Sequence, residues 1–304
     1  MTKIPFFSVV IPLFNRAATI TTVIKTVLEQ SEQDFEIVVV DDGSSDSPKA
    51  VIDKIADPRI TYIYQENGGG SKARNQGMRA ARGRFIAFLD SDDFFLKDHL
   101  KNARAVLEHQ TNACTYTQVK VDRGDGLFFL KPHRALRAGE HISEYLMADR
   151  GFVQTSTLII PNELARKIQY DEIIKSGQDY DFAIKICAAG YKLLMLEQPG
   201  AIWNDQWSPN RLSSKSHPEQ RLQWLERIRP MITNKAYWAE KGWPIAKGFS
   251  ADGKKIKGLK LYYGALIRGY YRPKMAIVIF LQVILSKENY RKLSDVLARF
   301  GVNP

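Results

Sequence analysis

Cysteine is scarce in this chain: among 304 residues only Cys114 and Cys187 carry a thiol. The two form no CxxC pair and show no Cys/His spacing typical of a metal site. A disulfide framework and a zinc module are therefore not expected. Two reduced, buried thiols of a cytosolic protein are the simpler interpretation.

Long apolar runs are missing as well. No stretch approaches the roughly 18 consecutive apolar residues that cross a bilayer. The best candidate, Met275 to Leu285, is too short and contains Gln282. The apolar run at the N-terminus ends at Asn15 and Arg16 without a small-residue cleavage site, so it lacks the features of a signal peptide.

Acidic residues are rare in the last third of the chain. Residues 201–304 hold 19 Lys and Arg but only 7 Asp and Glu, whereas residues 1–200 hold 25 and 26. The net charge of +11 therefore belongs to the C-terminal third. Such asymmetry indicates an anionic partner, which is either membrane lipid or nucleic acid.

The overall composition is that of a globular protein, with 44% apolar and 25% charged residues. The first hundred residues alternate between buried-strand and amphipathic-helix patterns. Strands are expected at Phe7–Ile11, Phe35–Val40, Ile60–Tyr64 and Phe85–Leu89, and helices around residues 20–28 and Lys72–Ala81. This alternation predicts an α/β fold, with an open, mainly parallel sheet and helices on both faces.

Later segments are less regular. The pattern predicts a strand at Thr157–Ile160 and a helix at Asp179–Ala189, and only helices beyond about residue 215. The loops of residues 113–176 are expected to decide the donor sugar, the acceptor and the linkage.

Two acidic clusters, at residues 41–46 and 90–93, each follow the carboxyl end of a predicted strand. Ligands of open α/β sheets bind beyond these ends, so we expect both clusters to face one crevice. In the second cluster, Asp90, Asp92 and Asp93 repel one another unless a cation compensates them, and Mg²⁺ and Mn²⁺ prefer carboxylate oxygens. The alternative is a helix N-cap at Asp92 or Asp93.

Three further segments allow two interpretations each. Asp41 to Ser44 fits an ordinary turn, or a carboxylate that contacts a base or a ribose. Asn67 to Gly77 is a glycine loop that opens into a helix; it is either a flexible connection, or a site where amides and Arg74 approach a diphosphate. Asp179 and Asp181 lie at the start of a predicted helix. They either stabilise the helix N-terminus, as acidic residues do, or one of them is a general base.

The order of five motifs resembles a known family. The segments SVVIPLFN, VVVDDGSSD, NGGGSKARNQG, FIAFLDSDD and GQDYDFAIKICAAG are similar to those of inverting family 2 glycosyltransferases with the GT-A fold, of the type found in bacterial polysaccharide biosynthesis. The resemblance covers roughly residues 5 to 215. It implies a Rossmann-like nucleotide half joined to an acceptor half in one domain, residues 1–215, and it leaves residues 216–304 as a helical, basic extension.

The resemblance also implies roles for single residues on the nucleotide side. Pro12 and Asn15 would line the nucleotide pocket, Asp42 would contact the base, and Arg74 would lie near the nucleotide. The donor would be a nucleotide sugar, most often UDP-linked in this family.

On the reaction side, Asp90 and Asp92 match the family's DxD motif, with Asp92 as the direct ligand of Mn²⁺ or Mg²⁺. Asp179 matches the second position of the Glu-Asp base motif. Gln178 stands where the family has Glu, which leaves Asp179 as the only acid of that pair and Asp181 as the reserve candidate.

Many relatives carry a histidine near the metal in a later stretch. Here residues 203–213 contain none, so the resemblance supplies no third protein ligand. This stretch allows two interpretations. It binds diphosphate or acceptor through Trp203, Trp207 and Arg211, or it is a packed aromatic loop.

The implied reaction is a single displacement with inversion. Asp179 removes a proton from the hydroxyl of a glycan or polyprenyl-linked saccharide acceptor, and the divalent ion on Asp92 neutralises the leaving diphosphate.

The basic tail interleaves lysines and arginines of residues 254–274 with four tyrosines, Tyr262, Tyr263, Tyr270 and Tyr271. Tyrosines and cations beside the apolar Met275–Leu285 suit a membrane interface. A tail packed on the catalytic domain is the alternative. We therefore expect a cytoplasmic enzyme in peripheral contact with the inner face of the cytoplasmic membrane.

A competing hypothesis is a nucleic-acid-binding protein on an inactive α/β scaffold, since the tail is basic and aromatic. The first 200 residues are nearly neutral and carry an acidic crevice that would repel a phosphate backbone. We therefore expect no nucleic-acid partner.

Overall fold

The computed structural model describes residues 3–124, 128–174, 177–205, 217–271, 273–286, 288–290 and 293. The chain divides into two compact units. Unit 1 comprises Met1–Ala138, Gly151–Ile173 and Gly177–Ser208, and unit 2 comprises Gly139–Arg150, Ile174–Ser176 and Pro209–Pro304. The domain boundary expected at residues 215 and 216 lies within or next to the undescribed segment 206–216, and Gly139–Arg150 joins the C-terminal unit.

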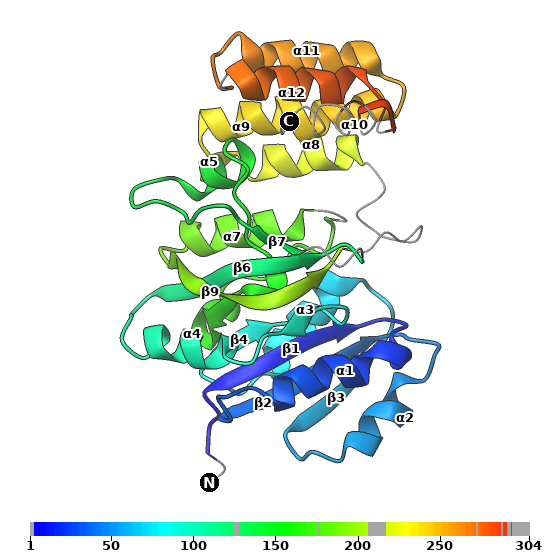
Figure 1. The fold of residues 1–304 in the computed structure, drawn as a ribbon, viewed down its shortest axis with the longest axis vertical. Coiled ribbons are helices and arrows are strands. Elements are labelled where there is room, and N and C mark those ends of the chain that lie inside the picture. Colours follow the sequence, from blue (N-terminus) through cyan, green and yellow to red (C-terminus); the bar gives the residue numbers. More distant parts are fainter. Residues whose placement is uncertain are drawn as a thin grey trace. The chain divides into compact units, whose positions relative to one another are not determined.

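Unit 1 contains the sheet, in the order β3-β2-β1-β4-β8-β6-β9-β5, with β7 paired to β6. Figure 1 shows the elements in sequence colours. The strands are β1 (Phe7–Leu13), β2 (Phe35–Asp42), β3 (Ile60–Gln65), β4 (Phe85–Phe88), β5 (Phe94–Phe95), β6 (Ala113–Asp122), β7 (Phe128–Lys131), β8 (Ile159–Pro161) and β9 (Lys192–Asn204). The helices of unit 1 are α1 (Ala17–Leu28), α2 (Pro48–Ile52), α3 (Gly70–Ala80), α4 (His99–Leu107), α6 (Asn162–Ala165) and α7 (Gln178–Ala188).

The first half of the sheet is parallel, as predicted. β1 pairs in parallel with both β2 and β4, and β2 pairs in parallel with β3. Side chains alternate along a strand, so Val9 and Ile11 of β1 join the core that includes α1, while Val10 meets α3. A Cβ at Gly77 of α3 would lie 2.3 Å from Val10, so this glycine allows the helix to approach the strand closely.

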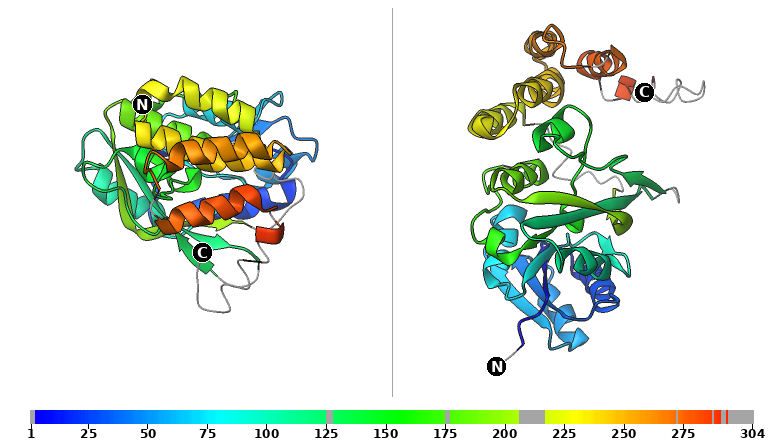
Figure 2. Two further views of the ribbon diagram at one scale, coloured as in Figure 1. Left: turned by 90° about the horizontal axis from the view of Figure 1, so that it is seen from above. Right: turned by 90° about the vertical axis from the view of Figure 1, so that its left-hand side faces the viewer.

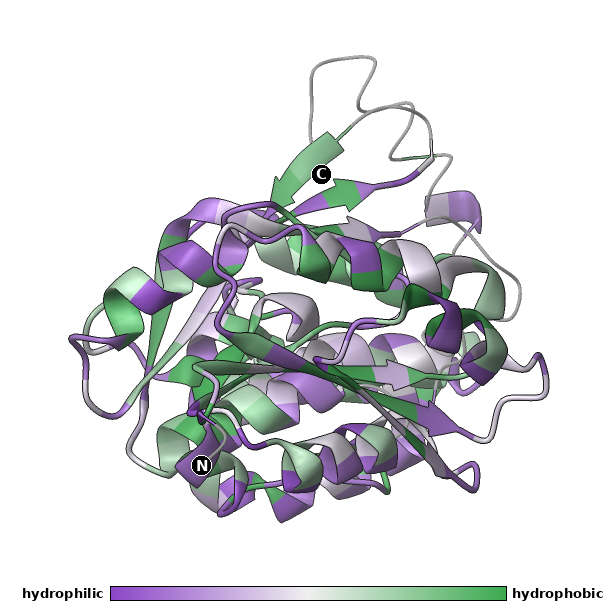
Figure 3. Cartoon of the chain, turned by 90° about the horizontal axis from the view of Figure 1, so that it is seen from below, coloured by the Kyte–Doolittle hydropathy of each residue, from purple (hydrophilic) through white to green (hydrophobic). Residues whose placement is uncertain are grey.

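The second half of the sheet is mixed and was largely missed. β8 pairs antiparallel with β4 and β6, β6 pairs in parallel with β9, and β7 and β5 add antiparallel edges. The strand predicted from Thr157 begins instead at Ile159, because Thr155–Thr157 form a 3₁₀ turn. Figure 3 shows apolar residues along the central strands and mixed colours along the helices. Cys114 and Cys187 are both free; Cys114 is buried as expected, whereas Cys187 is only partly buried.

Unit 2 is helical, which confirms the interpretation of the sequence beyond residue 215. Its helices are α5 (Ile142–Met147), α8 (Pro218–Arg227), α9 (Asn234–Glu240), α10 (Ala246–Ala251), α11 (Lys255–Leu266) and α12 (Pro273–Ile284), and a π-helical turn at Lys241–Ile245 joins α9 to α10. Tyr262, Tyr271, Ile279 and Val283 are buried in a core within this unit. No helix among the described residues is long and apolar enough to cross a membrane.

Candidate active site

Three loops meet at the carboxyl edge of the parallel strands, because β2 and β4 flank β1 in the same direction. Asn15, which follows β1, has a left-handed backbone with φ of 50°. Its amide donates to the Ser44 hydroxyl at 2.8 Å, and its side-chain oxygen accepts from the Ser45 amide at 2.8 Å. The loop after β1 is thus fastened to the loop after β2, and the buried Pro12 lies just before it in β1.

Asp42, the last residue of β2, is buried and fastens the glycine loop. Its carboxylate accepts hydrogen bonds from the amides of Gly68 and Gly69 at 2.8 and 2.7 Å, and from the side chains of Gln65 and Asn67 at 2.7 and 3.2 Å. These bonds hold the loop from which α3 begins. A contact between Asp42 and a nucleotide base stays a prediction.

Asp41 serves the turn itself. Its carboxylate accepts from the amide of Ser44 at 2.9 Å and from the hydroxyl of Tyr62. The interpretation of Asp41 to Ser44 as turn chemistry is therefore supported by these contacts. Asp46, farther along, accepts from the amide of Ala17 at 2.8 Å, at the first residue of α1.

Arg74 lies in the first turns of α3, where it is only 8% exposed and forms an ion pair with Asp90. Its guanidinium also lies 5.3 Å from the ring centre of Tyr170, which in turn stacks on Phe182 of α7. Burial lowers the pKa of Arg74, but Asp90, Tyr170 and Asp179 together outweigh burial and raise it. A buried cation therefore lies beside the acidic loop that follows β4.

Asp92 belongs to the same loop and is partly exposed. Its carboxylate pairs with Arg16, which follows β1, at 3.0 Å. No helix begins at Asp92 or Asp93: β5 follows directly, and α4 starts at His99. The alternative of a helix N-cap at this position is thus wrong.

Asp93 is buried, whereas Asp90 and Asp92 are partly exposed. It accepts from the side chains of Gln154 and Ser156 at 2.7 and 2.6 Å, and from the amide of Asn204 at 3.1 Å. Burial, together with the charges of Asp90 and Asp92, nevertheless raises its pKa well above the ordinary value. Asp93 therefore keeps its proton more readily than an ordinary carboxyl group does.

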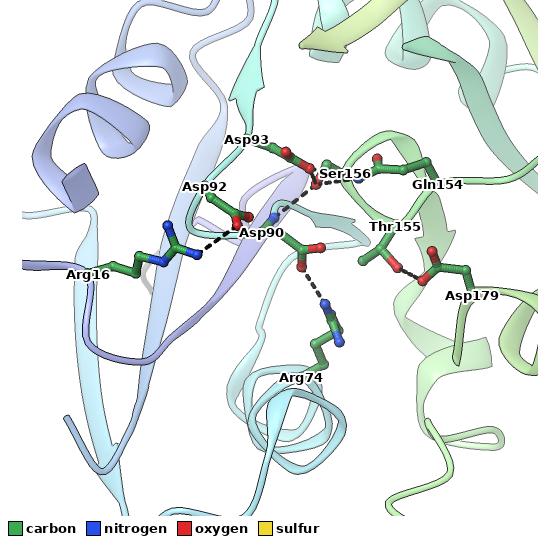
Figure 4. A network of polar contacts seen from close by, with 9 residues as sticks. All are labelled: Arg16, Arg74, Asp90, Asp92, Asp93, Gln154, Thr155, Ser156 and Asp179. Atoms are coloured by element: carbon green, nitrogen blue, oxygen red, sulfur yellow. Dashed lines mark hydrogen bonds and ion pairs between the residues drawn. The ribbon is translucent and has the colours of Figure 1, made fainter. Parts of the chain in front are cut away.

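Asp179 lies in the first turn of α7, and the hydroxyl of Thr155 donates a hydrogen bond to its carboxylate. Burial raises the pKa of Asp179 to about 6; the Thr155 hydrogen bond and the charge of Arg74 counteract this rise, and Asp90 adds to it. Figure 4 shows the Asp179–Thr155 contact close to the ion pair between Arg74 and Asp90. The arrangement provides a carboxylate that exchanges protons near neutral pH.

Asp181 has a different environment, although it lies only two residues away. It is buried, and it pairs with Lys185 one turn along the same helix at 2.7 Å. Of the two acids at the start of α7, Asp179 is the one whose carboxylate accepts from Thr155, with Arg74 and Asp90 acting on its pKa.

The profile of the family described as "Glycosyl transferase family 2" matches residues 8–173. The chain belongs to this family. AmsB of Erwinia amylovora, named an amylovoran biosynthesis glycosyltransferase, is 31% identical over 266 residues, which cover 83% of this chain and 87% of that protein. The chain is accordingly a nucleotide-sugar-dependent glycosyltransferase related to enzymes of polysaccharide biosynthesis.

Solved structures show the same fold. The S. aureus protein TarS (1–349), in complex with UDP-GlcNAc, has a TM-score of 0.68 at 22% identity, covering 97% of this chain and 92% of that one. The mannosyltransferase PcManGT of Pyrobaculum calidifontis, in complex with GDP-Man and Mn²⁺, has a TM-score of 0.58 at 18% identity, covering 98% and 85%. The glycosyltransferase therefore has the GT-A fold expected from its motifs. None of these proteins supports the nucleic-acid alternative.

Several polar residues of the glycosyltransferase site escaped the sequence analysis. Gln154, Thr155 and Ser156 contact Asp93 and Asp179, but they lie in a 3₁₀ turn and its entry, which have no periodicity to detect. Arg16 was noted only as the end of an apolar run. Their one signal is compositional, since three consecutive hydroxyl residues begin at Thr155.

Trp203, the penultimate residue of β9, stacks on Phe152 at a ring distance of 5.4 Å, and Lys131 lies 5.7 Å from its ring centre. These contacts agree with the packed-aromatic interpretation. Trp207 and Arg211 lie outside the described residues.

A divalent cation would find carboxylate oxygens but no complete protein cage in the glycosyltransferase. Among the described residues, no group of three or more His, Cys, Asp or Glu side chains is placed to hold a metal. Asp90 and Asp92 nevertheless offer two partly exposed carboxylates in one short loop, each paired with an arginine. Mg²⁺ and Mn²⁺ are commonly held by one or two carboxylates together with substrate phosphates, and the residues present fit that mode.

Proposed function

We propose that this glycosyltransferase moves a sugar, with inversion, from a UDP-linked donor to a hydroxyl of a glycan or a polyprenyl-linked saccharide. The observation that carries the proposal is the carboxylate of Asp179. It is held by Thr155, it is influenced by Arg74 and Asp90, and its pKa is raised to about 6. Such a group is mostly ionised at pH 7 and can accept a proton from a bound alcohol.

In the proposed step, the acceptor oxygen attacks the anomeric carbon of the donor as the bond from that carbon to the diphosphate oxygen breaks. The bonding electrons leave with the diphosphate, and the acceptor proton passes to Asp179. Attack from the face opposite the leaving group inverts the anomeric centre. Thr155 fixes the direction of the carboxylate, so that little reorganisation is needed when the acceptor binds.

Arg74 and the loop after β4 serve the donor side. The Arg74 guanidinium is a fixed positive charge that suits a diphosphate, and Asp90 holds it in place. Asp92 would be the protein ligand of Mn²⁺ or Mg²⁺, which, when bound, neutralises charge on the leaving diphosphate. Pro12, Asn15 and Asp42 would form the nucleotide side of the pocket, at the edge where their loops are fastened together.

The choice of donor and acceptor rests on the motifs and on the relatives. The family motifs imply a UDP-sugar, and TarS is described with UDP-GlcNAc, whereas PcManGT is described with GDP-Man. AmsB is named for the biosynthesis of a polysaccharide, which supports a saccharide acceptor.

A panel of UDP-, GDP- and dTDP-sugars tests the proposal, with donor hydrolysis and transfer measured with and without Mn²⁺ and in excess EDTA. We expect turnover of a UDP-sugar only with the metal. Asp179→Asn keeps the size of the side chain but removes its basicity, and transfer should fall about 10²-fold or more while nucleotide affinity changes little.

Asp181→Asn is the matched control, because it makes the same change two residues away at a carboxylate paired with Lys185. Thermal unfolding of both variants separates loss of stability from loss of chemistry. A larger loss of kcat in a folded Asp181→Asn protein would overturn the assignment of the base, and full activity in EDTA would overturn the metal.

A further inference from the structure

Helix α11 of unit 2 has two faces of opposite character. On one face Tyr262 and Ala265 are buried, and a Cβ at Gly258 would lie 2.6 Å from the carbonyl oxygen of Ala246 in α10. This close approach fixes which side of the helix faces the core of unit 2. Tyr262, Tyr271 and one side of α12 are therefore packed within unit 2 itself, and the other side of α11 needs a separate explanation.

That other side presents large apolar residues to solvent. Ile256 and Ile267 are 73% and 78% exposed, and Tyr263 is 48% exposed. With Lys260 they occupy positions 256, 260, 263 and 267, the spacing of one face of a helix. We call these four residues the α11 stripe. Single exposed isoleucines are ordinary, but a row of three large apolar side chains along one helix face is not.

Positive charge surrounds the same stripe. A pocket of about 490 Å³ at the start of α11 is lined by Gly253, Lys254, Lys255, Ile256, Lys257 and Lys260. Glu219 pairs with Lys254 and Lys257, at 3.3 and 3.1 Å. Lys255 and Lys260 form no ion pair with any described residue. The pocket therefore carries unbalanced positive charge beside exposed isoleucine.

Helix α12 extends this character. It packs beside α11, and Tyr262 donates a hydrogen bond to the carbonyl oxygen of Ala276 at 3.0 Å (Figure 2). Its first turns expose Lys274 and, one turn later, Ile277, which is 62% exposed. Two neighbouring helices thus present lysine and isoleucine to solvent.

We propose that the α11 stripe docks this protein on an anionic phospholipid surface. Ile256, Tyr263 and Ile267 enter the interface between headgroups and acyl chains, while Lys255 and Lys260 contact lipid phosphates. Lysine stems can lie along the apolar region with their ammonium groups at the phosphates. The occupant is a lipid surface because the stripe combines a narrow apolar row with a cationic border, which is the pattern of an interfacial helix.

This inference deepens the proposed function, on which it rests for its purpose, because a polyprenyl-linked acceptor would lie in a membrane. Vesicle binding can nevertheless be measured without any transfer. Asp179→Asn should bind vesicles as the unaltered protein does, so a failure of the proposed chemistry and a failure of docking give different results.

The experiment is co-sedimentation of the full chain with phosphatidylcholine vesicles, with and without phosphatidylglycerol. We expect binding only to the anionic vesicles, weakened at about 1 M salt, where the Debye length is about 3 Å. Lys255→Gln with Lys260→Gln should weaken binding about fivefold for each lysine. Lys25→Gln with Lys49→Gln, which removes the same charge from exposed positions of unit 1, is the control.

The apolar contribution is tested by Ile256→Ser with Ile267→Ser. Binding should fall about tenfold or more at low and at high salt, since apolar insertion is not screened. Ile4→Ser with Ile173→Ser, both at residues 70% exposed, is the control. Equal losses in stripe and control variants, or equal binding to neutral vesicles, would overturn the proposal. Sedimentation velocity tests whether a second copy of the chain covers the stripe instead. If the unaltered protein self-associates and Ile256→Ser with Ile267→Ser makes it monomeric, the occupant is a second copy and the proposal is overturned.

Discussion

Two acidic clusters lie at the carboxyl ends of β2 and β4, and their environments differ. At the end of β2, Asp42 accepts four hydrogen bonds from the glycine loop and its flanks, and Asp41 accepts from Tyr62 and Ser44. After β4, Asp90 and Asp92 pair with guanidinium groups, and Asp93 keeps a raised pKa despite its hydrogen bonds. Similar sequences therefore have different surroundings: the carboxylates of the first cluster organise a loop, whereas Asp90 and Asp92 of the second pair with arginines at the site that we propose for the donor diphosphate.

The largest expected effect is a loss of activity, caused by a substitution in the second cluster. Asp92→Ala should lower kcat by about 10²- to 10³-fold or more, because it removes the proposed ligand of the ion that stabilises the leaving diphosphate. Its melting temperature should hardly change, since the side chain is partly exposed and in contact with Arg16. Turnover assays and calorimetry on one preparation give both quantities. An Asp92→Ala protein that turns over normally would erase the distinction between the clusters.

The next largest effect is expected on stability, at the first cluster. Asp42→Ala leaves the amides of Gly68 and Gly69 without their acceptor, and the free energy of unfolding should fall by about 2–4 kcal/mol. Chemical denaturation measures this change. Asp53→Ala is the control, because Asp53 forms an exposed pair with Lys49 and should cost less than about 1 kcal/mol. Equal costs for the two variants would contradict the structural role of Asp42.

A third prediction concerns the base beside the second cluster. Activity should fall with decreasing pH through about 6 as Asp179 takes up a proton. The Thr155 hydrogen bond favours the ionised carboxylate and so lowers its pKa; Thr155→Val should therefore move the acidic limb of kcat upward by about one pH unit. Thr157→Val is the control, since that hydroxyl donates to the carbonyl oxygen of Gln154. An unmoved limb would exclude Asp179 as the titrating group.

The smallest expected effect lies within the second cluster. Arg16→Gln removes an exposed pair with Asp92 and should change the free energy of unfolding by less than about 1 kcal/mol. Arg74→Gln, in contrast, leaves Asp90 without its buried partner and should cost about 3–5 kcal/mol. Denaturation midpoints decide between the two. Similar values would show that burial does not distinguish the pairs.

The sequence predicted the parallel half of the sheet because continuous apolar runs mark buried strands. It missed β6, where Thr115 and Thr117 are buried among apolar residues, since polar side chains hide that pattern. It missed β9 because Pro199 and Gly200 resemble a turn, whereas the strand continues through them with a register shift opposite Thr117 and Val119. Pairings between distant strands decide both, and local patterns do not contain them.

The candidate site was predicted to a similar degree. Motif order placed Asp90, Asp92 and Asp179, and the structure brings their elements together. Contact partners such as Thr155 and Ser156 could not be foreseen, because their role depends on a turn that lies beside two loops distant in sequence.

Thr155 and Ser156 are consecutive, yet one hydroxyl bonds Asp179 while the other bonds Asp93 and accepts from the amide of Asp90 (Figure 4). Adjacent Cα atoms are about 3.8 Å apart, so one short piece of backbone carries the contacts to both carboxylates. Under the proposed mechanism, the proton acceptor and the loop beside the leaving group are thus tied to the same turn.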